Sequence, residues 1–303
     1  MIDQRAILIA GPTASGKSAL ALRLAEEAGG SIINADSMQV YRELRILTAR
    51  PSVEDEARVP HLLYGHVPAA EAYSAGRYAR EAAAAIAEVR RAGRRPVIVG
   101  GTGLYFRALL QGLSPIPEVP ADVRAHWRTE AQRLAPEALH ASLTARDPEM
   151  AARLRPTDPQ RVTRALEVLE GTGRSLAYWQ DQPGEPVLAE RDTIRLVVMP
   201  DREELYRRCD TRFGQMMAQG AMDEVGILAR LNLEPGLPAM RALGVAPLLQ
   251  LLAGELTKQA AIETASAETR QYAKRQLTWL KSNMRSWRSL STQETKSIGA
   301  SNL

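Results

Sequence analysis

The segment Gly11–Ser18, with the sequence GPTASGKS, constrains the fold of this chain more than any other stretch. It follows the apolar run Ala6–Ala10 and leads into Gly16–Ala28, where apolar residues recur at helical spacing. Its glycines and its Gly-Lys-Ser ending have the spacing of a phosphate-binding loop between a strand and a helix. The loop is typical of nucleotide-binding and ATP-binding proteins, but it indicates only a bound phosphate chain and does not identify the compound.

The chemistry of this loop follows from its residue types. Glycines let backbone N–H groups approach phosphate oxygens, and the start of the following helix adds a partial positive charge. Lys17 supplies a mobile cation, and the Ser18 hydroxyl is a ligand for Mg²⁺ bridging two phosphates. We therefore predict a phosphate site with Mg²⁺ as cofactor, formed by Gly11, Pro12, Thr13, Ala14, Ser15, Gly16, Lys17 and Ser18.

Strand and helix patterns alternate through the first third of the chain, which favours a parallel α/β sheet with helices on both faces. Further strands are expected at Ser31–Ala35, His61–Val67, Pro96–Val99 and Thr193–Pro200, and helices at Ser74–Ala92 and about Leu104–Leu110. The strand Ser31–Ala35 ends at Asp36, the only early apolar run followed by an acid.

The pattern of residues changes after about Leu113 and indicates a second part of the chain. The segment Leu113–Pro120 holds three prolines, and only helical patterns follow it up to about Gln180. We predict an inserted all-helical subdomain over residues 118–192, within a P-loop core of residues 1–117 and 193–303 that ends in helices. The polar stretch 291–303 is expected to be frayed.

Composition narrows the function classes. The net charge of +4 is too small to require a nucleic-acid partner and does not exclude one. Cys209 is the only cysteine, and the four histidines show no metal-ligand spacing. No apolar run is long enough to span a bilayer, so we expect no membrane contact. The single cysteine fits a reducing compartment, and we expect a cytoplasmic protein. By default we expect a monomer without an obligate protein partner.

Six blocks, of which the loop is the first, together resemble a known family. In order they read GPTASGKSALA, INADSMQVYRELRILTARP, AYSAGRYAREA, PVIVGGTGLYFRALLQGLSPIP, DPQRVTRALEV and TRQYAKRQLTWL. Together they resemble the bacterial tRNA dimethylallyltransferases, also called tRNA isopentenyltransferases, from about Ala6 to Leu280. The resemblance implies transfer of a dimethylallyl group from dimethylallyl diphosphate to N6 of the adenine on the 3′ side of the anticodon, in tRNAs reading codons that begin with U. The loop would then hold a leaving diphosphate.

The resemblance also implies roles for three residues. Asp36 is interpreted as the general base for the amine, although capping of the next turn or holding Mg²⁺ through water remain alternatives. Thr102, in GGTG, is expected to orient the amine or the donor, and a helix N-cap role is compatible with this. Arg212 is implied as a further charge on the diphosphate, where the residues alone would favour a solvated helix arginine.

The tRNA contacts expected from the resemblance lie in two regions, and the target base must flip out of its stack to reach a buried donor. Beside Asp36 and Thr102 they comprise Ser37, Met38 and Gln39, the last of which would read a base edge. In the insertion they comprise Arg124, Gln160, Arg161, Val162, Thr163 and Arg164, which would grip the anticodon stem-loop. Solvated helix faces are the alternative for each arginine.

Two features leave alternatives open. The stretch Thr269–Leu290 carries six basic residues and no acid, with Trp279 and Trp287 among them. It fits either backbone contact with tRNA or a packed, charged helix. Val245 stands where similar family segments commonly carry an aromatic, so it is left out of the site. The competing functions are a small-metabolite P-loop kinase with the insertion as its lid, and a non-catalytic RNA-binding protein.

Overall fold

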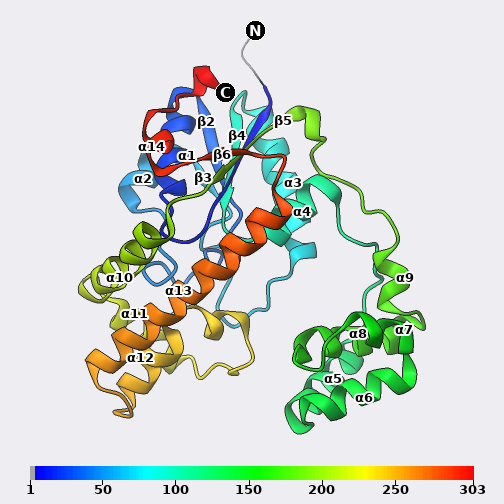
Figure 1. Cartoon of the computed structure of the whole chain (residues 1–303). Coiled ribbons are helices and arrows are strands. Elements are labelled where there is room, and N and C mark those ends of the chain that lie inside the picture. The colour runs from blue at the N-terminus through cyan, green and yellow to red at the C-terminus, as the bar shows by residue number, and fades with distance from the viewer. Residues whose placement is uncertain (1–3) are drawn as a thin grey trace. The chain divides into compact units, whose positions relative to one another are not determined.

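A computed structural model describes residues 4–303, and its centre is one parallel sheet (Figure 1). The six strands run in the order β3-β2-β4-β1-β5-β6, and every neighbouring pair is parallel. Their bounds are β1 Ala6–Ala10, β2 Gly30–Asn34, β3 His61–Leu62, β4 Arg95–Gly100, β5 Thr193–Val198 and β6 Arg288–Leu290. Parallel strands bring their carboxyl ends to one edge, where open α/β sheets bind ligands.

Helices cover both faces of the sheet, which confirms the predicted fold class. Alternate residues of β1 divide between two cores, as the two-residue period of a strand requires. Ile7 and Ile9 pack with α1 (Lys17–Glu27) and with Ile298, which follows α14 (Thr292–Ser297). Leu8 packs with α3 (Ala75–Arg91) and α4 (Gly103–Gln111) on the other face. The short helix α2 (Val53–Arg58) precedes β3.

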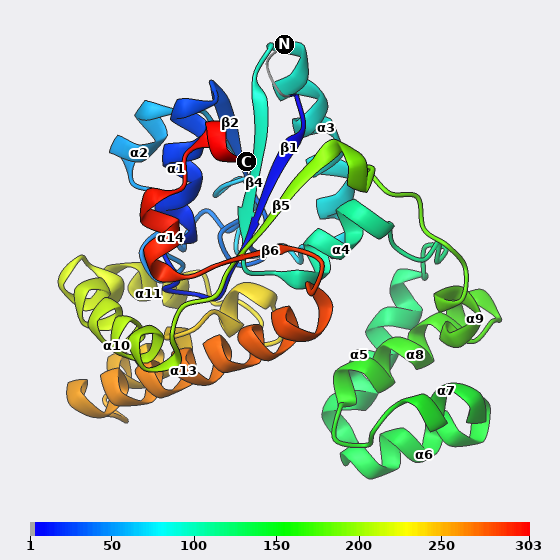
Figure 2. The same cartoon turned by 45° about the horizontal axis from the view of Figure 1, so that its top comes forward.

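A group of helices lies beyond the carboxyl ends of the strands (Figure 2). It comprises α10 Arg202–Ala218, α11 Ala221–Arg230, α12 Val245–Leu252 and α13 Lys258–Asn283. Their apolar faces form one core with Val40, Tyr41 and Leu44 from the segment after β2. Val245 is fully buried in this core, so the position without an aromatic is a packing position.

The chain divides into two compact units, and residues Gln111–Pro186 form the smaller one. Its helices are α5 Ala121–Arg133, α6 Pro136–Arg146, α7 Pro148–Arg153, α8 Pro159–Thr172 and α9 Leu176–Gln180. Trp127, Leu139, Leu143 and Leu166 are central to its own core. Prolines begin three of these helices, and Asp147 and Asp158 cap α7 and α8 through their side chains.

Two expectations about secondary structure are wrong. The predicted strand His61–Val67 ends at Leu62, because Leu63 and Gly65 take left-handed φ values of 63° and 55° that a strand does not allow. The stretch 291–303 is ordered rather than frayed, since Ser291 and Glu294 form a capping box at α14. Arg23 also donates to the carbonyls of Thr295, Lys296 and Ile298.

The strand β6 was not predicted, because two of its three residues are exposed and give no apolar run. Three short 3₁₀ turns complete the secondary structure, η1 Glu190–Asp192, η2 Pro238–Arg241 and η3 Ala300–Asn302. No helix within residues 4–303 is long and apolar enough to cross a membrane.

Candidate active site at the carboxyl edge of the sheet

The phosphate-binding loop occupies the turn between β1 and α1, as its sequence predicts. Gly16 adopts φ 88° and α1 begins at Lys17, so the amides at the helix start face the loop. The loop is joined to β4, because Gly11 N donates to Gly100 O at 3.3 Å. The Oγ of Ser15 is buried and has no hydrogen-bond partner within residues 4–303, whereas Ser18 is exposed. The turn thus presents polar groups that internal bonds do not use up.

Lys17 is held inside the loop. Only 8% of the residue is exposed, and its Nζ donates to Pro12 O at 3.2 Å. Burial lowers the pKa of Lys17 to about 8, with the carboxylate of Asp36 opposing and the guanidinium of Arg212 adding to the effect. A bound phosphate would supply the anionic partner that this amine lacks, so the lysine is poised for an anion.

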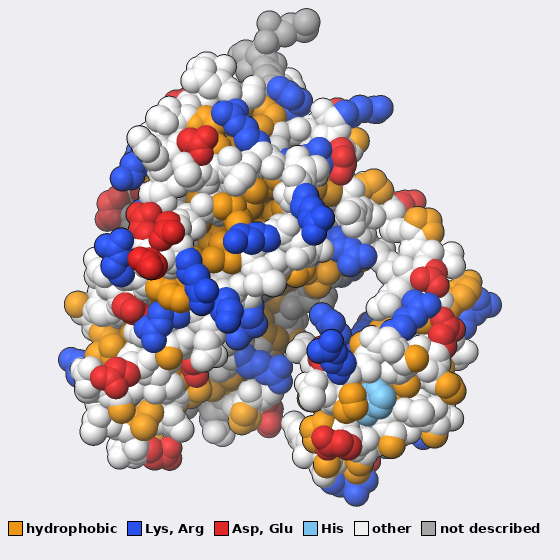
Figure 3. All heavy atoms as spheres, in the orientation of Figure 1, with side chains coloured by type: hydrophobic (Ala, Val, Ile, Leu, Met, Phe, Trp, Pro, Cys, Tyr) orange, Lys and Arg blue, Asp and Glu red, His pale blue; other side chains and the backbone are white. Residues whose placement is uncertain are grey.

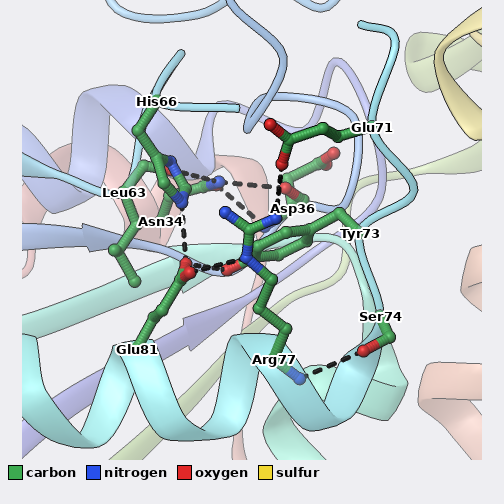
Figure 4. A network of polar contacts seen from close by, with 9 residues as sticks. All are labelled: Asn34, Asp36, Leu63, His66, Glu71, Tyr73, Ser74, Arg77 and Glu81. Carbon is green, nitrogen blue, oxygen red and sulfur yellow. Dashed lines mark hydrogen bonds and ion pairs between the residues drawn. The ribbon is translucent and has the colours of Figure 1, made fainter. Parts of the chain in front are cut away.

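Asp36 follows β2 and is fixed by Asn34, a residue that sequence reasoning missed. The buried Asn34 side chain accepts from Asp36 N at 2.8 Å and donates to Asp36 O at 2.9 Å and Leu63 O at 3.0 Å (Figure 4). Asp36 Oδ1 accepts from Met38 N at 3.0 Å, so the turn-capping role is realised. The same carboxylate has a second oxygen, Oδ2, so capping leaves a group for acid–base chemistry.

Thr102 joins the ends of β2 and β4. Its Oγ1 accepts from Ser37 N at 2.9 Å and donates to Ser37 Oγ at 3.3 Å, and its amide donates to Ala35 O at 3.2 Å. The Thr102 hydroxyl therefore bonds to the segment that carries Asp36. At the start of α4, Tyr105 N donates to the carbonyl of Thr102 and not to its hydroxyl, so the side chain does not cap the helix. Thr102 is thus bonded to the residues on either side of Asp36, Ala35 and Ser37.

Arg212 reaches this edge from α10. Its NH1 donates to Thr13 Oγ1 at 3.4 Å, and its removal from water lowers the pKa of the guanidinium. The side chain thus contacts the loop and is only partly exposed to solvent. Arg208, one turn earlier, was not predicted, although its NH1 would lie 3.8 Å from a Cβ built on Gly16. The i, i+4 spacing of the two arginines is the signal that was available.

Three tyrosines also surround Asp36. Burial first, and the Asp36 carboxylate after it, raise the pKa values of Tyr64, Tyr105 and Tyr272. Tyr105 is stacked on the buried Tyr78 with 3.7 Å between ring centroids. The hydroxyl groups of these three tyrosines therefore remain protonated at neutral pH.

The segment after β2 is held by bonds of its own. Gln39 is buried, and its Nε2 donates to Thr48 O and Ala49 O at 2.9 Å each, so its amide nitrogen is occupied within the chain. Met38 packs against the core of the helical group. Glu224, which sequence reasoning missed, accepts from Ile46 N and from Leu47 N at 3.0 Å. Further along, Glu81 accepts from Tyr73 OH at 2.6 Å and pairs with His66 and Arg77 (Figure 4).

The predicted tRNA stretch in the smaller unit begins α8 and divides by exposure. Gln160 and Arg161 are exposed, and Arg161 pairs with Asp158 at 3.3 Å. Arg164 is half-exposed and pairs with Glu167, and Arg124 on α5 is half-buried. Val162 is fully buried and the Thr163 hydroxyl donates to Pro159 O, so their side chains serve the helix and its core. The arginines and Gln160 are the members free to meet a partner.

Basic side chains also line the helices beside the loop. Figure 3 shows Lys and Arg residues gathered over α10 and α13 on the visible face. On α13 and the turn after it, Lys274, Arg275, Lys281 and Arg285 are exposed, whereas Trp287 is buried against Phe106. Trp287 therefore packs the core, and the basic residues face solvent.

The described part of the chain contains no cluster of three or more His, Cys, Asp or Glu that could hold a metal, and His126 is exposed. His61 contacts Val59 O, and His140 contacts Ala151 O and Leu154 O. Cys209 is buried against Leu205 and Ala273, where burial raises the pKa of its thiol.

Comparison with known proteins agrees with this arrangement. The IPP transferase family model matches residues 39–283, and an isopentenyl transferase model matches residues 4–64. A tRNA dimethylallyltransferase of Parvibaculum lavamentivorans is 54% identical over 98% of this chain and 94% of its own length. One from Rhizobium meliloti is 50% identical over 93% of each chain.

Solved structures give the same result. The chain aligns with a tRNA isopentenylpyrophosphate transferase of Bacillus halodurans at 31% identity and a TM-score of 0.67, covering 95% of this chain and 90% of the other. A eukaryotic dimethylallyltransferase captured acting on tRNA aligns with a TM-score of 0.81 at 28% identity, over 97% of this chain and 75% of its own. The phosphate loop, the acid after β2 and these matches over nearly the whole length lead to one conclusion: the chain belongs to the IPP transferase family.

Proposed function

We propose that the protein transfers the dimethylallyl group of dimethylallyl diphosphate to the N6 amine of an adenine in tRNA and releases diphosphate. The adenine is the one 3′-adjacent to the anticodon (position 37) in tRNAs that read codons beginning with U. One observation carries the proposal: a cationic loop lies at the same edge of the sheet as Asp36 and Thr102, whose hydroxyl bonds to Ser37, the residue next to Asp36.

The donor's diphosphate lies in the loop Gly11–Ser18. Its charge replaces Pro12 O as the partner of Lys17, and the Arg212 guanidinium beside Thr13 faces the same phosphates. These groups are in place before the reaction, so they stabilise the negative charge that builds up as the C–O bond breaks. The allylic carbon spreads its own positive charge by resonance. The main contribution to the activation barrier that the protein must lower is therefore the negative charge on the departing diphosphate.

The acceptor amine lies at Asp36. As the new C–N bond forms, N6 loses a proton to the carboxylate, and the electron pair of the C–O bond leaves with diphosphate. Thr102 positions Ser37, and with it the segment that carries Asp36.

Mg²⁺ fits this site as a cofactor. Ser18 is exposed at the start of α1 beside Lys17, and Mg²⁺ in proteins is commonly held by few side chains together with substrate phosphates. Ser18 and the diphosphate oxygens would hold the ion, which would neutralise charge on the leaving group.

The tRNA contacts that we propose begin with the residues around the base, namely Ser37 and Thr102. The exposed Gln160 and Arg161 with the half-exposed Arg164 suit the anticodon stem-loop. The basic face of α13 suits phosphate contacts, which would make binding salt-dependent.

The direct test is incubation with tRNA and dimethylallyl diphosphate, followed by digestion and mass analysis of the nucleosides. We expect one prenylated adenosine per tRNA with wild type, and Asp36→Asn should lower the single-turnover rate at least about 100-fold with tRNA affinity unchanged. Asp223→Asn, at an exposed site on α11, is the matched control.

Two results would replace this function. Strong stabilisation by ATP with phosphoryl transfer and no prenyl transfer would identify a small-metabolite kinase. Tight tRNA binding without any label reaching adenine would identify a non-catalytic RNA-binding protein.

A further inference from the structure

One buried side chain bonds to both substrate-facing loops. Gln276 of α13 is 6% exposed, and its carboxamide makes two hydrogen bonds. Its Oε1 accepts from the backbone N of Thr13 at 2.9 Å, and its Nε2 donates to the backbone O of Gly101 at 3.0 Å. Thr13 belongs to the phosphate loop, and Gly101 lies in the turn that carries Thr102. A single amide plane therefore spans the donor side and the acceptor side.

The carboxamide of Gln276 lies close against Gly101. A Cβ built on Gly101 would lie 2.3 Å from Gln276 Nε2 and 3.4 Å from Asp36 Oδ2. A side chain at Gly101 would therefore force the Gln276 carboxamide to move. One turn further along α13, Trp279 covers Gly103, where a Cβ would lie 2.2 Å from its ring. The helix thus rests directly on the turn next to Asp36.

Apolar contacts pack α13 on both sides of Gln276. Ala261 and Ala265 pack in the core of the helical group, Ala273 packs against α10, and Leu280 packs in the core with α3 and α4. The Gln276 carboxamide instead bonds to the backbone of the two loops. Its hydrogen bonds therefore act on the placement of these loops.

We propose that Gln276 is a positioning residue that sets the distance between the diphosphate loop and the acceptor side of the site. This inference rests on the proposed function. Thr13 N points at Gln276 rather than at a substrate, so Thr13 acts through the placement of the loop and through Arg212. The reacting carbon and N6 are brought together only if both loops keep their spacing, and a misplacement of about 1 Å can cost 100-fold in rate.

The chemistry of the carboxamide selects the test variants. Methionine keeps the length and loses both hydrogen bonds, so Gln276→Met removes the link. Glutamate in its ionised form keeps an acceptor for Thr13 N and meets Gly101 O with an oxygen that cannot donate. When protonated it can accept and donate as the amide does. Burial next to Asp36 favours that protonated form, since a nearby like charge opposes ionisation.

The experiment measures single-turnover prenyl transfer at saturating tRNA and dimethylallyl diphosphate, with donor and tRNA affinities measured separately. Gln276→Met should slow transfer about 10- to 100-fold while both dissociation constants change less than about threefold. The rate of Gln276→Glu relative to wild type should rise as the pH falls from 8 to 6. Gln259→Met, at an exposed position of the same helix, should match wild type.

The outcomes separate the inference from the function. If Gln276→Met gave a smaller amplitude of transfer with an unchanged rate constant, Gln276 would only stabilise the fold, and the inference would be overturned. A defect confined to donor affinity, or a pH-independent ratio for Gln276→Glu, would also overturn it. If wild type transfers no prenyl group, the proposed function is wrong. If wild type is active and Gln276→Met transfers the group at the same rate, only the inference about Gln276 is wrong.

Discussion

The lowered pKa of Lys17 makes donor binding depend on pH in a defined direction. In the free protein burial holds this pKa at about 8, and a bound diphosphate raises it by supplying the missing anion. A group whose pKa rises on binding contributes fully below the free pKa of about 8, and its contribution is lost as the pH rises above that value. The donor's own phosphates, with a second pKa of about 6, are already ionised in this range.

The magnitude follows from the free pKa. About 90% of Lys17 is protonated at pH 7 and about 10% at pH 9, so the donor's affinity should fall about tenfold, or about 1.4 kcal/mol. Titration calorimetry at pH 7, 8 and 9 measures this, and near pH 8 binding should take up about half a proton. Lys17→Arg stays charged throughout, so its donor affinity should be flat over the same range.

Equal affinities of wild type at pH 7 and pH 9, with no proton uptake, would refute the assignment of Lys17 to the phosphates. Folding provides a second check with its own sign. Because the folded pKa is depressed, the unfolded chain binds more protons between about pH 8 and pH 10.5, so Lys17 makes the free energy of unfolding rise with pH in that window.

Three further predictions test the scaffold and the charge around the loop. Arg212→Ala should lower kcat/KM about 100-fold by removing a preorganised cation, and a variant with unchanged kcat/KM would return Arg212 to a structural role. Glu224→Gln weakens the acceptor of Ile46 N and Leu47 N, so it should cost about 1–2 kcal/mol and a few degrees of Tm, and an unchanged melting curve would contradict the anchoring role of this carboxylate. Arg23→Ala removes three hydrogen bonds to the carbonyls of α14 and Ile298, so hydrogen exchange over 292–298 should accelerate while β1 stays protected. Equal exchange rates in wild type and Arg23→Ala would mean that α14 is held by its apolar contacts alone.

Much of the core could be predicted from the residues, because its elements depend on neighbours in sequence. The apolar run of β1, the glycine spacing of the next turn and the helical pattern after it predict a strand, a loop and a helix from adjacent residues alone. The same local logic placed Asp36 at the end of β2 and Thr102 after β4. It failed at Leu63, where a left-handed residue ends the strand and its carbonyl accepts a hydrogen bond from Asn34, 29 residues away.

The chain by itself determined that phosphate would be held at the first strand-to-helix turn, because backbone geometry and helix polarity there are properties of a few adjacent residues. Only the tertiary structure decided what surrounds that turn. Arg212 and Gln276 reach Thr13 across 199 and 263 residues of chain, and Asn34, which bonds to Asp36 directly, also bonds to the Leu63 carbonyl on another segment. The partners of a side chain depend on which elements the topology brings together, and no local pattern carries that information.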